Sequence, residues 1–205
     1  MLVITNFMVF SLRKGQEEQT KTDILNNTKL AVETVARVAK SAKSVEAANS
    51  QPDSNSPGAP ANLYSWSAVA GSGATLILAI PAHDASNNLI YSDGLHNNLY
   101  TNDYIYYLDA STHRLYRRII ANQSAPGNAA VTTCPPAIAT PSCPADALTV
   151  EDVANLTTSY FDANNNPVAI PTGTEAVEMT LTQTRSVLGK TYSSSYTTLA
   201  SLRNK

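Results

Sequence analysis

The sequence is poor in charge, and the two signs nearly cancel. Charged residues make up 15% of the 205 residues and the net charge is −2, whereas soluble proteins carry about 25% charged residues. Without a basic excess the chain cannot neutralise a phosphate backbone, so general nucleic-acid binding is not expected. The abundance of uncharged Ser, Thr and Asn is common in proteins found outside the cell.

Motifs of catalysis and metal binding are also missing from the sequence. The three histidines are scattered over turn-like segments, and no serine stands in a Gly-x-Ser-x-Gly context. Asp162 opens a segment that resembles a calcium loop, but Pro167 and Gly173 stand where that loop requires Gly and Glu. This segment is predicted to be an Asn-rich turn. We therefore expect no catalytic residue, no metal ion, no cofactor and no small-molecule substrate.

Cysteine is scarce, and the two cysteines lie close together in a proline-rich segment. Cys134 and Cys143 are each followed by proline. A disulfide between them would close a loop of about ten residues and contribute roughly 2 to 3 kcal/mol. The alternative is a pair of unpaired thiols, and zinc is disfavoured because no further Cys or His lies nearby in sequence. A disulfide implies an oxidising compartment.

The chain starts with an apolar run, residues 1–10, that is too short to span a bilayer, which requires about 20 residues. It has no basic start and no small-residue cleavage site, so it does not match a signal peptide. Arg13 and Lys14 follow the run, as expected where a helix leaves the hydrocarbon on the positive-inside face. Residues 1–10 are therefore interpreted as the last half of a membrane helix.

Residues 11–48 are predicted to continue this helix as an amphipathic stem. No proline or glycine occurs from Gln16 to Ala48, and apolar or small residues recur at spacings of three and four. Such a stripe is typical of one helix face packed against a sheet or another helix, and the lysines fall mostly on a solvated face. The predicted packing and assembly residues are Leu25, Thr28, Val32, Val35, Ala39 and Ala42.

Residues 49–62 contain three prolines and a glycine, and are predicted to form a linker before a β-rich head at 63–205. Within the head, 73–80 is an apolar run typical of a buried strand. Residues 103–108 and 113–120 read as a hairpin, since both are rich in aromatic and β-branched residues. Residues 176–184 alternate strictly between apolar and polar, which specifies a half-buried strand, and 192–202 alternate more weakly.

The densest basic cluster of the head is Arg114, Arg117 and Arg118. On a strand, Arg117 and Arg118 would point to opposite faces. We expect a solvated strand edge with some carboxylate pairing; the alternative is contact with DNA, in a role in DNA uptake.

The order of these parts resembles type IV pilin-like proteins, specifically minor pilins and the J-class minor pseudopilins of type II secretion. Four segments carry the resemblance along nearly the whole chain: the apolar start with its stem, 104–118, 153–168, and 176–182 with the closing residues 202–204. The family's leader and the first half of its N-terminal helix are expected to lie upstream of Met1 or to have been removed.

The resemblance implies a pilin-like fold, with a long N-terminal helix packed on an antiparallel β-sheet head, within the α+β class that the residue patterns indicate. It also implies a non-enzymatic filament subunit that sits in the inner or cytoplasmic membrane before assembly. Its partners would be other pilin subunits, bound through the N-terminal helix at the cell surface. The alternative is a surface-tethered binding or adhesin module on a helical stalk.

Overall fold

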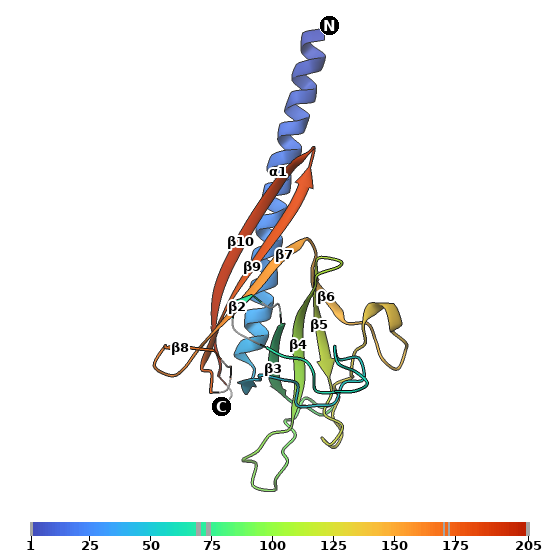
Figure 1. The fold of residues 1–205 in the computed structure, drawn as a ribbon, viewed down its shortest axis with the longest axis vertical. Helices are drawn as coiled ribbons and strands as arrows, with labels where there is room; N and C mark the ends of the chain where they lie inside the picture. The colour runs from blue at the N-terminus through green and yellow to red at the C-terminus, as the bar shows by residue number, and fades with distance from the viewer. Residues whose placement is uncertain (1, 69–70, 73–74, 170, 172, 204–205) are drawn as a thin grey trace.

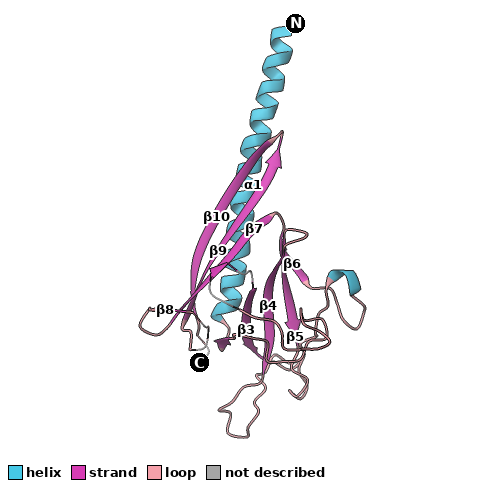
Figure 2. Cartoon of the chain, viewed as in Figure 1, coloured by secondary structure: helices cyan, strands magenta, loops and turns pink. Residues whose placement is uncertain are grey.

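The computed structural model describes residues 2–68, 71–72, 75–169, 171 and 173–203. Within these residues the chain forms a single long N-terminal helix whose C-terminal part packs against two antiparallel sheets (Figures 1 and 2). This is the expected α+β fold. The elements are α1 (Leu2–Lys40), β1 (Ser44–Val45), β2 (Gly71–Ser72), β3 (Thr75–Pro81), β4 (Thr101–Asp109), β5 (Arg114–Ile120), a 3-10 helix (Pro136–Ile138), β6 (Ala147–Val150), β7 (Val153–Phe161), β8 (Pro167–Val168), β9 (Ala176–Val187) and β10 (Lys190–Ser201).

The helix ends at Lys40, earlier than the predicted end at Ala48. No proline or glycine stops it there. Instead the main chain turns and pairs with β3: the amide of Lys43 donates to the carbonyl of Ala79 and the amide of Glu46 donates to that of Ile77. The prediction of helix over 41–48 was wrong because a strand edge offers this segment hydrogen bonds that local sequence does not reveal.

The first sheet has the strand order β1-β3-β4-β5-β6. The predicted hairpin is confirmed, with β4 and β5 antiparallel and Tyr106 opposite Arg117. β3 confirms the buried strand predicted from the apolar run, since Leu76, Ile77 and Leu78 are all buried. The predicted start of that run, residues 73–74, lies outside the described residues.

The second sheet has the order β10-β9-β7-β2, with β8 paired to β7. Its strand β9 confirms the half-buried strand predicted from alternation: Val177, Met179 and Leu181 are buried while the residues between them are partly exposed. β10 pairs with β9 over its whole length and follows α1 in space (Figure 1).

The first sheet is buried on both faces, which explains why β3 is continuously apolar. On one face α1 and the second sheet close a core with residues such as Leu78, Tyr106 and Leu115. On the other face Trp66 covers Ile77 and Ile105. Trp66 is held on this face by the segment that precedes it in sequence, residues 49–62.

Residues 49–62 form part of the head and are not the linker that the prolines and glycine suggested. The Asp53 carboxylate is buried and accepts hydrogen bonds from Trp66 Nε1 at 2.7 Å and Arg118 Nη1 at 2.8 Å. Asp103 accepts hydrogen bonds from the backbone amides of Ser50 and Gln51, at 2.7 and 2.8 Å. The segment lacks regular structure, but hydrogen bonds of Ser50, Gln51 and Asp53, in its first part, anchor it to the first sheet.

Candidate assembly surface and the adjoining groove

The N-terminal part of α1 extends beyond both sheets and carries exposed apolar side chains (Figure 1). Phe7, Met8, Phe10 and Leu12 are each at least 60% exposed. Met1 lies outside the described residues, and so do the side chains of residues 2–6. Within the part of α1 that the structure describes, no stretch has the length and hydropathy that a membrane-spanning helix requires. We name the exposed side chains of Phe7, Met8, Val9, Phe10 and Leu12 the apolar tip.

The C-terminal part of α1 contributes to the core of the head. Of the predicted packing residues, Val32, Val35 and Ala39 are buried on the helix, and Ala42 is buried just beyond its end. Leu25 is instead 51% exposed, and the preceding residue Ile24 occupies the buried face. Leu25 therefore does not pack on the head, and its role in assembly with neighbouring stems stays a prediction.

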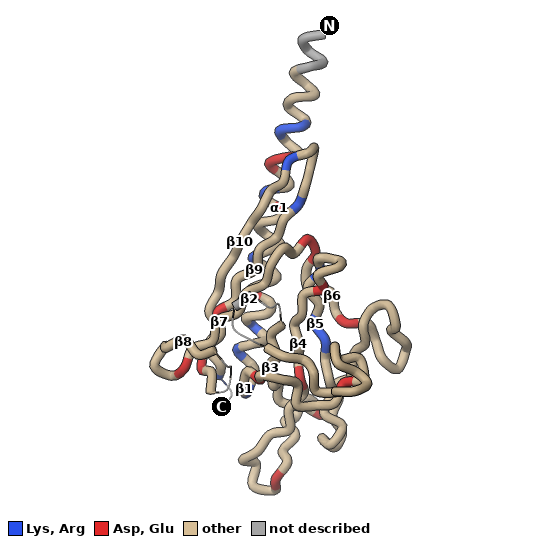
Figure 3. The backbone as a smooth tube through the Cα atoms, viewed as in Figure 1, with Lys and Arg blue, Asp and Glu red and all other residues tan. Residues whose placement is uncertain are grey.

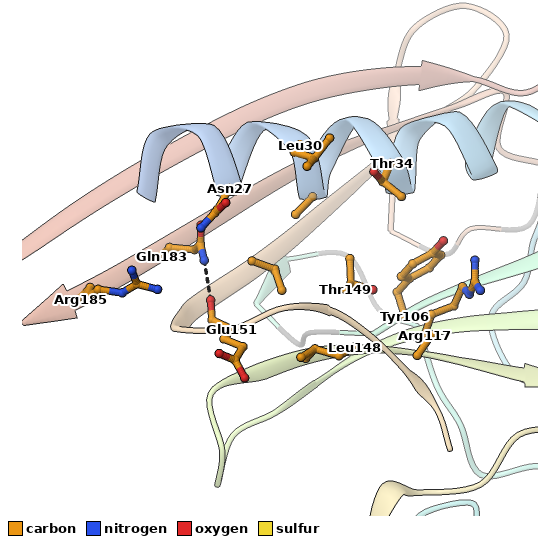
Figure 4. Close-up of a pocket in the computed structure, with 13 residues that line it drawn as sticks. Asn27, Leu30, Thr34, Tyr106, Arg117, Leu148, Thr149, Glu151, Gln183 and Arg185 are labelled. Carbon is orange, nitrogen blue, oxygen red and sulfur yellow. Dashed lines mark hydrogen bonds between the residues drawn. The ribbon is translucent and has the colours of Figure 1, made fainter. Parts of the chain in front are cut away.

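Thr28 is fully buried on the same helix face. Its hydroxyl oxygen lies 2.7 Å from Oε1 of Gln183 on β9 and 2.6 Å from the Ile24 carbonyl one turn earlier, and these two acceptors share its single proton. Gln183 Nε2 in turn donates to the carbonyl of Glu151, drawn as a dashed line in Figure 4. This chain of hydrogen bonds links α1 to β9 of the second sheet and to Glu151, which lies between β6 and β7.

The β9–β10 hairpin holds α1 near both ends of the part that it covers. Lys190 Nζ lies 2.8 Å from Glu17 Oε1, and the Arg203 amide donates to the Lys40 carbonyl at 3.3 Å. The hydrogen bond from Lys190 lowers the pKa of Glu17, and the reciprocal contact raises the pKa of Lys190. Charges of both signs follow one another along this part of the helix (Figure 3).

A groove of about 410 Å³ lies beside the buried face of α1, between the helix and the first sheet (Figure 4). One wall is the helix, where Asn27, Leu30, Ala31 and Thr34 recur at helical spacing. The other boundaries are Tyr106 of β4, Arg117 of β5, residues 147–151 and two side chains of β9, Gln183 and Arg185.

Two buried polar groups of residues that line this groove form no hydrogen bond of good geometry with a described residue. Tyr106 is 1% exposed, and its hydroxyl forms no hydrogen bond of good geometry with a described residue; the polar side chain that interacts with it is that of Arg117. The second group is the buried Nε of Arg117, whose guanidinium lies 5.5 Å from the Tyr104 ring centre. Burial raises the pKa of Tyr106 to about 12, against the opposing charge of Arg117, so the phenol remains protonated at neutral pH.

The three clustered arginines have three different environments, contrary to the expected solvated edge. Arg114 is exposed and pairs with Glu151 at 2.7 Å, as a solvated arginine should. Arg117 lines the groove on the helix side of the sheet. Arg118 is fully buried on the other side, between Asp53 and Asp146. The prediction that Arg117 and Arg118 point to opposite faces is confirmed.

The disulfide links Cys134 and Cys143, whose Cα atoms are 5.5 Å apart. Thr133 precedes the loop that the disulfide closes and Asp146 follows it, and Thr133 Oγ1 donates to Asp146 Oδ1 at 2.6 Å. Asp146 also accepts from Tyr107 OH at 2.7 Å. The segment that follows the disulfide loop thus supplies Asp146, one of the two carboxylates that surround Arg118.

The remaining motifs are structural in character. Asp162 closes an Asn-rich turn, in which its Oδ1 accepts from the amides of Asn164 and Asn166, each at 2.8 Å. In the part of the chain that the structure describes, no three His, Cys, Asp or Glu side chains gather as a metal site would require.

Sequence reasoning missed the groove and the burial of Arg118. For the groove a signal was present, since alternation along the hairpin places Tyr106 and Arg117 on one face. For Arg118 no local signal exists, because its partners are distant in sequence. Comparison of the chain with models of known protein families and with curated proteins finds no match.

Proposed function

We propose that this protein is a non-enzymatic minor pilin or pseudopilin, a subunit of a type IV pilus or of a type II secretion-like filament. The observation that carries the proposal is the division of α1: its C-terminal part belongs to the core of the head, while the side chains of its apolar tip remain 43% to 71% exposed. A helix, antiparallel sheets and a disulfide are together compatible with the pilin-like fold that the sequence resembles.

The partners of the apolar tip are the N-terminal helices of other subunits, or the membrane before assembly. Burial of each large apolar side chain contributes roughly 1.5 to 3 kcal/mol, so the exposed side chains from Phe7 to Leu12 supply a substantial driving force. The head would face outward at the cell surface and determine which neighbour is accepted.

The contact between helix and head favours this proposal over an adhesin on a free stalk. Val35 and Ala39 are in the core of the head, and Glu17 is tied to the β9–β10 hairpin. A stalk that acts only as a spacer needs no such packing. An adhesin head would fold without α1, whereas this head shares its core with the helix.

Assembly can be separated from folding with one substitution in the apolar tip. Val9→Asp, introduced in the source cell, should abolish incorporation into filaments because a carboxylate cannot be buried unpaired among apolar helices. The purified variant should melt at the wild-type temperature, since Val9 lies outside the head. Incorporation is measured by immunogold labelling of the filaments and melting by circular dichroism.

Leu95→Asp is the matched control, because Leu95 is an exposed leucine of the head, at 80% exposure, far from the apolar tip. This variant should be incorporated like the wild type. Normal incorporation of Val9→Asp, or equal loss in both variants, would contradict assembly through the apolar tip.

A further inference from the structure

The β9–β10 hairpin ends beside the base of the apolar tip. Its two strands are joined by only two residues, Leu188 and Gly189. The turn of the hairpin points in the same direction as the N-terminal end of α1 (Figure 1). Between the turn and the helix lies a hollow of about 390 Å³, which is lined by Phe10, Arg13, Lys14, Glu17, Leu188 and Lys190. The turn therefore lies at the level where the apolar tip leaves the head.

Leu188 has a backbone conformation that leucine rarely adopts. Both residues of the turn have positive φ, 53° at Leu188 and 76° at Gly189, as a type I′ turn requires. Asn, Asp and Gly are favoured at such positions, and a bulky residue is uncommon there. The Leu188 side chain is also 52% exposed. A leucine that has neither a favourable backbone conformation nor full burial indicates a contact outside the chain.

The same surface carries more positive than negative charge. Glu17 and Glu18, the carboxylates within reach of Lys14 at helical spacing, are each paired with another lysine. Arg13 and Lys14 are both exposed, and neither forms a salt bridge with a described residue. Two cations are therefore in excess at this place, although the chain as a whole has a net charge of −2.

Given a filament subunit whose apolar tip lies in the membrane before assembly, as proposed above, we propose that this surface binds a bilayer of anionic phospholipids. Leu188 enters the boundary between headgroups and acyl chains, where apolar side chains of interfacial segments are buried. Arg13 and Lys14 contact lipid phosphates, because an anionic bilayer surface attracts cations that lie close to it. The head then contacts the membrane both through the helix and through the turn, which fixes its orientation.

The combination of charge and apolar surface favours a bilayer over other ligands. A free phosphate would bind the cations but would leave Leu188 exposed. Apolar helices would cover Leu188 but would provide no counter-charge for Arg13 and Lys14. A second copy that docks through the same surface would bring like charges together. An anionic bilayer offers phosphates and an apolar interior at adjacent depths, which matches both features.

The charge dependence is tested with the full chain and vesicles of phosphatidylcholine, either alone or mixed with an equal amount of phosphatidylglycerol. Flotation of the vesicles measures binding, which should be tighter to the mixed vesicles. Arg13→Gln and Lys14→Gln should each weaken binding to the mixed vesicles about fivefold. Arg37→Gln and Lys40→Gln are the controls, since these exposed residues at the other end of α1 lie about 36 Å away along the helix. This distance exceeds the Debye length, so the control variants should bind like the wild type.

Leu188→Asn separates the lipid contact from folding. Because Asn is favoured at positive φ, this variant should melt at the wild-type temperature or above it. It should nevertheless bind the mixed vesicles about tenfold more weakly, since the apolar contact is lost. Leu95→Asn, at an exposed leucine of another loop of the head, is the matched control and should bind like the wild type.

The position of the turn is measured directly with Leu188→Trp. Its fluorescence should shift to shorter wavelength when the mixed vesicles are added, because the indole leaves water. The native Trp66 is 8% exposed and should contribute a constant background. Leu95→Trp should show no shift. No shift with Leu188→Trp would overturn the proposal.

Three further results would overturn the proposal. The first is equal affinity of the wild type for both kinds of vesicle, and the second is wild-type affinity of Leu188→Asn for the mixed vesicles. The third is stronger release from vesicles by sodium phosphate than by sodium chloride at equal ionic strength, which would identify a free anion as the ligand.

Failure of the lipid contact can be distinguished from failure of the proposed function. Loss of filament incorporation in Val9→Asp, combined with equal binding of the wild type to both kinds of vesicle, would reject the lipid contact and retain the filament subunit. Normal incorporation of Val9→Asp, combined with weaker vesicle binding by Leu188→Asn, would reject assembly through the apolar tip and retain the lipid contact.

Discussion

Arg118 Nη1 lies 2.8 Å from Asp53 Oδ2, and both side chains are 1% exposed. On the opposite side Arg118 Nε lies 3.3 Å from Asp146 Oδ1. One buried arginine thus joins the irregular segment 49–62, the first sheet and the segment that follows the disulfide loop. This contact fixes the parts of the head that have the least regular structure.

We expect Arg118→Met to be severely destabilising. It leaves Asp53 and Asp146 buried without their cation, and breaking a buried ion pair in this way costs about 3 to 5 kcal/mol. The free energy of unfolding is measured by urea denaturation. Arg114→Met is the control, since Arg114 is exposed and its pair with Glu151 should contribute less than about 1 kcal/mol. Similar losses in both variants would mean that the buried pairs do not stabilise the head.

A carboxylate placed on the buried face of α1 should unfold the head. Val35 is 3% exposed, so Val35→Asp buries an unpaired charge and removes several kcal/mol of the roughly 5 to 15 kcal/mol available. Leu25→Asp, at a half-exposed position of the same helix, should change stability by less than about 0.5 kcal/mol. Melting temperatures report both effects. Equal melting of Val35→Asp and the wild type would show that helix and head fold independently.

Reduction of the disulfide should weaken the head without dismantling its sheets. The bonded cysteines are nine positions apart, and closing a loop of this size contributes roughly 2 to 3 kcal/mol. The Cys134→Ser, Cys143→Ser double variant should lose stability by that amount and become insensitive to reductant. Mass spectrometry without reduction should show two fewer hydrogens in the wild type. Two freely alkylated thiols in protein purified without reductant would contradict the pairing.

The ion pair between Glu17 and Lys190, at the end of the β9–β10 hairpin, should be detectable in the titration of the Glu17 carboxylate. Because the folded protein holds the pKa of Glu17 below its ordinary value, the pair stabilises at neutral pH, and its contribution is lost as pH falls through that lowered pKa. Lys190→Met removes the main cause and should move the pKa of Glu17 upward. Carbon-13 NMR of the Glu17 carboxylate follows this change. An unchanged pKa would show that the hairpin does not reach the helix in solution.

The regular elements were predictable because their periodicity is local. Alternation identified β9, and the β4–β5 hairpin followed from its aromatic and β-branched residues. The end of α1 was not predictable, because β3 captures the following residues by backbone pairing that any sequence could make. Burial of Arg118 was equally hidden, since it depends on Asp53, which lies 65 positions earlier. The spacing of three and four predicted that one face of the helix is buried. It did not decide which of the adjacent residues Ile24 and Leu25 lies on that face.

Strand β10 lies along α1, with contacts at Glu17 near one end and at Lys40 near the other. Tension applied to the first turns of the helix would therefore reach the β9–β10 pair before the first sheet. The contacts between α1 and β10 would carry that load, because Lys190, at the start of β10, is the residue tied to Glu17. The hairpin therefore braces this part of the helix.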